Sequence, residues 1–153
     1  MVKTSKDIVM GVPVEVLEFE QGVETVESAS RESGEPISKI VKTLLIKAGN
    51  EYAVMLVRGD KRVDLNKLSQ LLGKEVVMAK AKEVKQVLGV EVGAVTPLSE
   101  RVRLLKVIMD PSILENEYIL CGGGSKNKLF RVNVKDLVQL LKPEFLDAFT
   151  QVS

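Results

Sequence analysis

Histidine is absent from this 153-residue sequence, and there is a single cysteine, Cys121. The lack of histidine excludes a Ser-His-Asp triad, a Cys-His pair and a histidine general base. One cysteine cannot form an internal disulfide, and without histidine it provides no donor set for structural zinc. No clustered Asp/Glu motif supports a magnesium site. We therefore expect no metal and no cofactor, and we expect Cys121 to be a small buried apolar residue rather than a nucleophile.

Long apolar runs are also missing. No segment approaches the roughly 20 apolar residues that span a bilayer, and Lys3, Lys6 and Asp7 interrupt the place where a signal peptide would be apolar. The chain is 45% hydrophobic and 28% charged, which is typical of one globular domain over residues 1–153. Together with the single cysteine, this favours a reducing, cytoplasmic setting with no membrane partner.

Charge is balanced overall, at +1, but unevenly distributed. Residues 1–36 hold 3 basic and 8 acidic side chains, whereas residues 74–106 hold 7 basic and 4 acidic ones. Residues 122–135 hold 4 basic side chains and no acidic one. The two basic segments are candidates for contact with a polyanion, although solvated surface lysines explain the same pattern. With 4% aromatic residues, base stacking has little support.

Short strands are expected to outnumber short helices. The pattern predicts strands over 14–19, 41–46, 52–57, 75–78, 104–109, 118–121 and 129–134. Helices are expected over 25–33, 65–72, 81–88 and 136–141, with a last helical turn within 144–152. Thr25, Asp64 and Asp136 are the expected N-caps, and Gly49-Asn50 marks a hairpin turn. The leucine stripe of the second helix is expected in the core, and its members are Leu65, Leu68, Leu71 and Leu72. This order is typical of one α/β or α+β domain around a mixed sheet.

A lysine interrupts an otherwise apolar strand face. If residues 40–46 form a strand, Ile40, Lys42, Leu44 and Ile46 share one face. A buried ammonium is costly unless a partner compensates it. Lys42 therefore either reaches solvent along its aliphatic stem or serves a functional site. The strand pattern alone favours the first interpretation.

Two glycine-containing segments are candidate binding loops. In GAVTP, Gly93 to Pro97, the proline restricts the backbone and the glycine relaxes it, which can hold several N–H groups in an array suited to an oxyanion. In CGGGS, residues 121–125, three glycines allow the backbone to approach an anion closely. The segment matches neither a Walker loop nor a dinucleotide-binding motif. An ordinary connecting loop and a flexible hairpin are the competing interpretations.

The order of these segments is similar to that of a known family. The sequences VKTLL, VRGDKRVDLNKLSQLLG, EVVMAKAKEVKQVLGVEVGAVTPL and CGGGS together resemble the YbaK/ProX family of trans-editing aminoacyl-tRNA deacylases. That family is similar to the editing insertion of bacterial prolyl-tRNA synthetase. The likeness runs from about residue 14 to residue 141. It implies a twisted, partly closed mixed sheet flanked by short helices, and hydrolysis of the ester between tRNA and a wrong small amino acid such as Cys, Ala, Ser or Pro.

The resemblance also implies roles for individual residues. The family's lysine falls on Lys42, its G-x-x-x-P loop on Gly93 to Pro97, and its late glycine segment on 122–124. The predicted catalytic residues are Lys42, Gly93 and Pro97. The predicted substrate-binding residues are Thr43, Ala94, Val95, Thr96, Gly122, Gly123 and Gly124. Lys42 would orient the terminal adenosine or the amino-acid carbonyl, and loop amides would stabilise the oxyanion while water attacks; the alternative is Lys42 as a general base with a lowered pKa.

The implied partner is the acceptor end of aminoacyl-tRNA, and the sequence leaves open whether a synthetase accompanies it. Many relatives have Phe-Gly directly after the loop, where this chain has Leu98-Ser99. The difference keeps open a second function, a non-catalytic tRNA- or synthetase-binding module of the same fold. A third interpretation, a nucleotide-binding protein that uses CGGGS, lacks a phosphate-binding lysine at the expected spacing.

Overall fold

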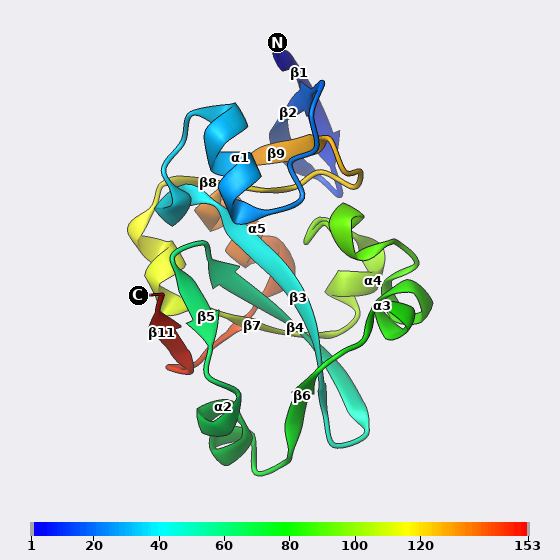
Figure 1. Cartoon of the computed structure of the whole chain (residues 1–153), viewed down its shortest axis with the longest axis vertical. Helices are drawn as coiled ribbons and strands as arrows, with labels where there is room; N and C mark the ends of the chain where they lie inside the picture. The colour runs from blue at the N-terminus through cyan, green and yellow to red at the C-terminus, as the bar shows by residue number, and fades with distance from the viewer. Residues whose placement is uncertain (1, 153) are drawn as a thin grey trace.

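Mixed sheets and short helices build the molecule, in a computed structural model that describes residues 2–152 (Figure 1). The strands are β1 (Val2–Val9), β2 (Val12–Phe19), β3 (Val41–Ala48), β4 (Glu51–Arg58), β5 (Lys61–Val63), β6 (Val76–Met78), β7 (Lys106–Met109), β8 (Tyr118–Gly122), β9 (Lys128–Asn133), β10 (Glu144–Phe145) and β11 (Phe149–Gln151). The helices are α1 (Val26–Ser33), α2 (Leu65–Leu72), α3 (Ala81–Leu88), α4 (Glu100–Arg103) and α5 (Val134–Leu141). Three short 3-10 helices complete the list: η1 (Ile37–Lys39), η2 (Val92–Ala94) and η3 (Pro111–Glu115). The expected mixed α/β class is confirmed.

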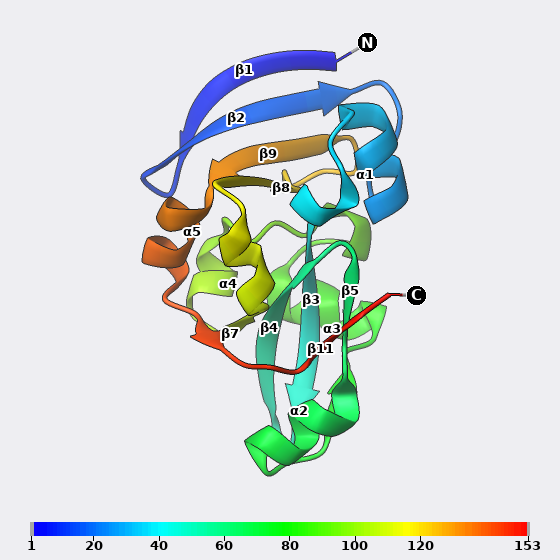
Figure 2. The ribbon, with the colours of Figure 1, turned by 90° about the vertical axis from the view of Figure 1, so that its left-hand side faces the viewer.

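Two sheets form the frame. One has the order β1-β2-β9-β8 and is antiparallel throughout. The other has the order β10-β7-β4-β3-β6 and is mixed, because β7 pairs in parallel with both β4 and β10. In Figure 2 the strands of the first sheet run across the strands β3 and β4 of the second. A parallel bridge between Ile40 and Leu120 joins the two sheets where β3 begins.

Local signals place most of the helices. Thr25 caps α1, with its hydroxyl accepting from the Ser28 N–H at 3.0 Å, and Asp64 caps α2 through the Lys67 N–H. Gly34 and Gly73 end these two helices in the left-handed conformation that glycine adopts without cost. The two-residue turn Gly49-Asn50 joins β3 to β4 as expected.

Three apolar clusters hold these layers together. The largest lies between the sheets and takes residues from β2, β3, β4, β8, β9 and α5. A second covers the other face of β3 and β4, beneath α2 and β11. The third lies beneath α1 and includes Leu17, Ile40, Leu120 and Leu129. Since β3 is covered on both faces, its edge is the part of the strand that remains available to a site.

Three sequence expectations are wrong, and one strand was not expected. Residues 144–152 contain the short strands β10 and β11 rather than a helical turn, because they pair with β7 and β5. Asn133 caps α5, and Asp136 lies within the first helical turn. Leu71 is 51% exposed and lies outside the core. The chain also begins with the unexpected strand β1, whose residues pair with β2 over their whole length.

No helix within residues 2–152 combines the length and apolar character that a bilayer crossing requires.

Candidate active site

A cavity of about 510 Å³ lies between the free edge of β3, helix α1, the end of β8 and the turn η2. Half of the predicted site residues line it, namely Lys42, Thr43, Gly93, Val95 and Gly122. The other half, Ala94, Thr96, Pro97, Gly123 and Gly124, do not. Segments that are about 30 to 80 residues apart in the sequence therefore line one cavity. The β3 segment contributes both of its predicted residues, and the two glycine-containing segments contribute only part of theirs.

The edge of β3 supplies one wall. Strand β6 joins β3 only at Ile46–Ala48, so the preceding residues pair with no further strand in the described structure apart from the bridge at Ile40. The Gly59 N–H donates to the Ile40 carbonyl on the β4 side, while the Ala79 N–H donates to the Leu45 carbonyl on the other side. Because alternate residues of a strand point their backbone groups to opposite sides, Thr43 directs its N–H and C=O toward the cavity.

Lys42 reaches the same cavity from this strand. Its side chain is half-buried, and its Nζ donates to the Lys61 main-chain carbonyl at 2.9 Å. Burial lowers the pKa of the Lys42 amine below its usual value, and the nearby carboxylates of Glu27 and Asp60 partly oppose this. The amine thus neither extends freely into solvent nor lies in the closed core.

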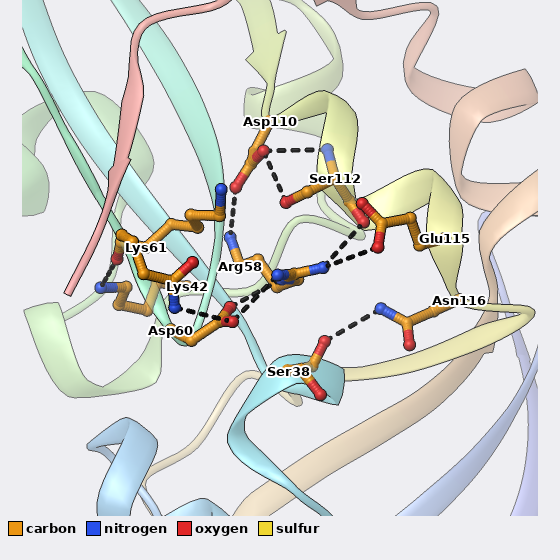
Figure 3. A network of polar contacts seen from close by, with 10 residues as sticks. Ser38, Lys42, Arg58, Asp60, Lys61, Asp110, Ser112, Glu115 and Asn116 are labelled. Carbon is orange, nitrogen blue, oxygen red and sulfur yellow. Dashed lines mark hydrogen bonds and ion pairs between the residues drawn. The ribbon is translucent and has the colours of Figure 1, made fainter. Parts of the chain in front are cut away.

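A polar network holds the turn beneath Lys42 (Figure 3). Arg58 donates to both carboxylate oxygens of Asp60, at 2.6 and 2.9 Å, and to the Ser112 carbonyl at 3.3 Å. Hydrogen bonds from Arg58 lower the pKa of the Asp60 carboxyl group. Asp110, the buried carboxylate at the start of η3, accepts from the Arg58 N–H and from Ser112. The network fixes the β4–β5 turn that carries the carbonyl acceptor of Lys42.

The GAVTP loop forms the opposite wall and is anchored at its end. Pro97 and Leu98 are buried, and Leu98 belongs to the largest core cluster. The Thr96 hydroxyl accepts from the Leu98 N–H at 3.2 Å, so that hydroxyl serves the loop itself. The Leu98-Ser99 pair therefore has structural roles here, since Ser99 caps α4.

The end of β8 touches this loop directly. A Cβ atom placed on Gly122 would lie 2.0 Å from the carbonyl oxygen of Val95, so only glycine permits the contact. A Cβ atom placed on Gly123 would lie 2.9 Å from the carbonyl carbon of Lys128, whereas one on Gly124 would meet nothing within 4 Å. Gly122 and Gly123 thus serve close backbone packing.

Cys121 precedes these glycines and is 1% exposed. Burial raises the pKa of its thiol to about 12. The thiolate is therefore scarce near neutral pH, and the expectation of a small buried residue is confirmed.

Sequence reasoning missed most of the cavity lining, including Glu24, Glu27 and Val152. The first two flank the N-cap Thr25, where acidic residues are common at helix starts, so the sequence offers no separate signal for them. The Oγ1 atom of Thr43 is buried without a hydrogen-bond partner among residues 2–152. No group of three or more Cys, Asp or Glu side chains in that range is arranged to hold a metal ion.

Comparison with known proteins identifies the family. The family model described as the aminoacyl-tRNA editing domain matches residues 20–140. The chain belongs to the aminoacyl-tRNA editing domain family. This editing domain is 36% identical over 132 residues to the proline--tRNA ligase of Thermotoga sp. strain RQ2, covering 86% of this chain and 22% of the ligase. It is 29% identical over 124 residues to the uncharacterized protein YwhH of Bacillus subtilis strain 168, covering 80% and 78% of the two chains.

Solved structures extend the comparison to the fold. A crystal structure described as "a putative trans-editing enzyme for prolyl tRNA synthetase" superposes with a TM-score of 0.80 and 28% sequence identity, over 88% of this chain and 85% of that one. The editing domain spans only 16% to 22% of the length of the ligases that it matches. Its likeness to them concerns one region of those proteins.

Proposed function

We propose that this editing domain hydrolyses the ester bond between tRNA and a mismatched small amino acid. The observation that carries the proposal is the convergence of Lys42, the GAVTP loop and Gly122 on one cavity in a member of this family. An aminoacyl ester is already activated, so the site needs orientation and charge stabilisation more than a strong nucleophile. The absence of histidine is compatible with that demand.

Loop amides are the proposed oxyanion donors. The Ala94 N–H is already bonded to the Glu91 carbonyl at 2.9 Å, and Pro97 has no N–H. Within residues 2–152, the N–H groups of the cavity residues Gly93 and Val95 have no main-chain acceptor and are available to a substrate carbonyl. One such donor contributes on the order of 10²–10³ in rate.

The remaining chemistry falls to water and Lys42. The water oxygen attacks the ester carbonyl carbon, and the bond from that carbon to the ribose oxygen then breaks. The ribose oxygen takes up the proton that water loses, leaving free amino acid and uncharged tRNA. The Lys42 ammonium orients the terminal nucleoside or the carbonyl from the opposite wall.

The tRNA end requires cationic and apolar contacts outside the cavity. Several basic residues of the two predicted segments are engaged in ion pairs, such as Lys85 with Glu91 and Arg131 with Glu15. Lys128 lines the cavity, and the Lys126 carbonyl accepts from the Val23 N–H beside it. We propose that these two lysines meet the acceptor-end phosphates, with the 57% exposed Val92 beneath the terminal base. Charged tRNA as substrate implies a cytoplasmic location.

Deacylation of a panel of charged tRNAs tests the proposal. The panel carries alanine, serine, cysteine and proline, and loss of the ester is followed against an enzyme-free control. We expect hydrolysis of at least one ester well above the control. Retained tRNA binding with no turnover on any ester would instead support the alternative, a non-catalytic module of the same fold.

A further inference from the structure

Glu24 is a cavity residue that the proposed reaction does not use. Its backbone is fixed on both sides, because the Val23 N–H donates to the Lys126 carbonyl at 2.8 Å and Thr25 caps α1. Val23 itself is 4% exposed and packs in the cluster beneath α1. The backbone position of Glu24 on the cavity wall is therefore set by Val23 and Thr25, and its side chain is exposed.

Two glycines make room for the Glu24 carboxylate. A Cβ atom on Gly22 would lie 3.0 Å from Oε1, and one on Gly93 would lie 2.5 Å from Oε2. Any side chain at either position would compete for the space that the carboxylate fills. The carboxylate thus lies against the first residue of the GAVTP loop, where the substrate carbonyl is proposed to bind.

This carboxylate has no cationic partner within residues 2–152. It takes part in none of the ion pairs or side-chain hydrogen bonds of the described structure. Glu27 and Asp60, in contrast, are the carboxylates that act on the Lys42 amine. Glu24 therefore presents unused acceptor oxygens to the cavity at a point separate from Lys42.

The substrate carries a matching cation. In an aminoacyl ester the α-amine is attached to the carbon next to the reacting carbonyl, and α-amines are largely protonated at pH 7. A carbonyl held by the loop amides would bring that ammonium within reach of a carboxylate lying on Gly93. We propose that Glu24 binds the α-ammonium group, so that the site accepts esters with a free amine and rejects N-acylated ones. The inference rests on the proposed function and adds a substrate class to it, since N-blocked aminoacyl-tRNA and peptidyl-tRNA would be spared.

A rival role for Glu24 is easily separated from this one. A general base acting on water would matter equally for free and N-blocked esters, whereas an ammonium-binding group matters only for the free amine. The decisive comparison is therefore between two substrates, alanyl-tRNA and N-acetyl-alanyl-tRNA, in the wild type and in Glu24→Gln.

For the wild type we expect acetylation to lower kcat/KM by about ten- to a hundredfold, the range of a hydrogen bond between charged groups. Glu24→Gln should lower kcat/KM for alanyl-tRNA by a similar factor and abolish the difference between the two substrates. The matched control is Glu32→Gln, which removes an α1 carboxylate paired with Arg31 outside the cavity and should keep the wild-type preference. Equal losses on both substrates in Glu24→Gln, or no loss on either, would overturn the assignment.

A binding measurement keeps the inference testable apart from catalysis. The probe is 3′-alanylamino-3′-deoxyadenosine, an amide that resists hydrolysis, compared with its N-acetyl form by calorimetry. We expect the free amine to bind the wild type at least about tenfold more tightly and to lose that advantage in Glu24→Gln. Tight, amine-dependent binding without ester turnover would defeat the hydrolase proposal alone. Equal or undetectable binding of both probes to the wild type would defeat the Glu24 assignment.

Discussion

Gly122 and Val95 touch through their backbones, with no space between them for a side chain. A Cβ atom on Gly122 would lie 2.0 Å from the Val95 carbonyl oxygen. The contact joins the end of β8, in one sheet, to the GAVTP loop. Since Pro97 and Leu98 anchor the loop in the core, the loop is held at both its middle and its end. The cavity wall is therefore positioned by packing that leaves little freedom.

Gly122→Ala should lower both stability and hydrolysis. The added methyl group meets main-chain atoms that cannot rotate away, and overpacking of this kind costs about 1–3 kcal/mol. Denaturant unfolding and deacylation kinetics measure the two effects. A variant with wild-type stability and wild-type turnover would show that the contact with Val95 does not shape the site.

Gly93→Ala should separate these two effects. Here the added methyl group meets only the flexible side chain of Glu24, whose Oε2 would lie 2.5 Å away. We expect a stability change within about 0.5 kcal/mol, as for a change without main-chain clash, together with lower kcat/KM because Glu24 is displaced. Loss of stability comparable to that of Gly122→Ala would contradict this expectation.

Lys42→Met should lower activity strongly without loss of stability. Burial lowers the pKa of the Lys42 amine in the folded protein. At pH values between the folded and unfolded pKa, the unfolded chain binds more protons than the folded one, so the free energy of unfolding rises with pH. Burial of the charged amine is a net cost that Glu27, Asp60 and the Lys61 carbonyl offset only in part, and methionine removes it. We expect an equal or higher Tm and a rate loss of about 10²–10³, the size of one electrostatic contact in an active site.

Lys47→Met is the control for that variant. It removes an amine from the same strand that lies over Tyr52 and does not line the cavity. Its turnover should stay at the wild-type level. A wild-type rate in Lys42→Met would remove the amine from the mechanism.

Asp60→Asn should destabilise the protein and flatten its acid dependence. Hydrogen bonds from Arg58 lower the pKa of the Asp60 carboxyl group below 3.8. The ionised Asp60 carboxylate therefore stabilises the fold fully above pH 3.8, and this stabilisation is lost as the pH falls through its lowered pKa in the folded state. We expect the free energy of unfolding to fall by about 1–2 kcal/mol at pH 7, allowing for partial exposure of the pair. Between about pH 5 and pH 2, the range for such a carboxylate, the stability of the variant should decline less steeply than that of the wild type.

The exposed pair of Arg31 and Glu32 provides a matched comparison, with side-chain exposures of 67% and 28%. Glu32→Gln should change stability by less than about 0.5 kcal/mol at pH 7. Acid unfolding followed by circular dichroism compares the two variants with the wild type. Equal acid profiles for wild type and Asp60→Asn would show that the pair with Arg58 adds no pH-dependent stability.

Replacing Lys126 and Lys128 together by alanine should weaken tRNA binding and reduce its salt dependence. Each phosphate contact on a single strand contributes about 0.7 to the slope of log K against log salt, so two lost contacts should reduce the slope by about 1.4. Lys3→Ala with Lys6→Ala, on the exposed strand β1 and outside the cavity lining, is the charge-matched control. Measurements of tRNA binding over a salt series compare the two double variants. An unchanged slope in the variant without Lys126 and Lys128 would exclude these lysines from the tRNA contact.

The local sequence determined individual secondary-structure elements of this protein. The apolar, β-branched runs of β3 and β4, the caps Thr25 and Asp64, and the turn at Gly49-Asn50 each act within a few residues, so their structures could be predicted. The GAVTP segment was expected to be non-helical, but Gly93 and Ala94 lie in the 3-10 helix η2. For Lys42 the strand pattern alone left two interpretations open and favoured a side chain that reaches solvent.

Only the tertiary structure decided how those elements pair and pack against one another. Strand β1 carries Lys3, Ser5 and Asp7 and shows no strand pattern, yet it pairs with β2 after a turn in which Met10 and Gly11 both have positive φ. Residues 144–152 became strands because β7 and β5 offered unpaired edges to them. Glu24 reached the loop of Gly93 across 69 positions of the chain, and no spacing rule encodes that contact. Pairing and packing energies act between distant segments, so they set the site only once the chain is folded.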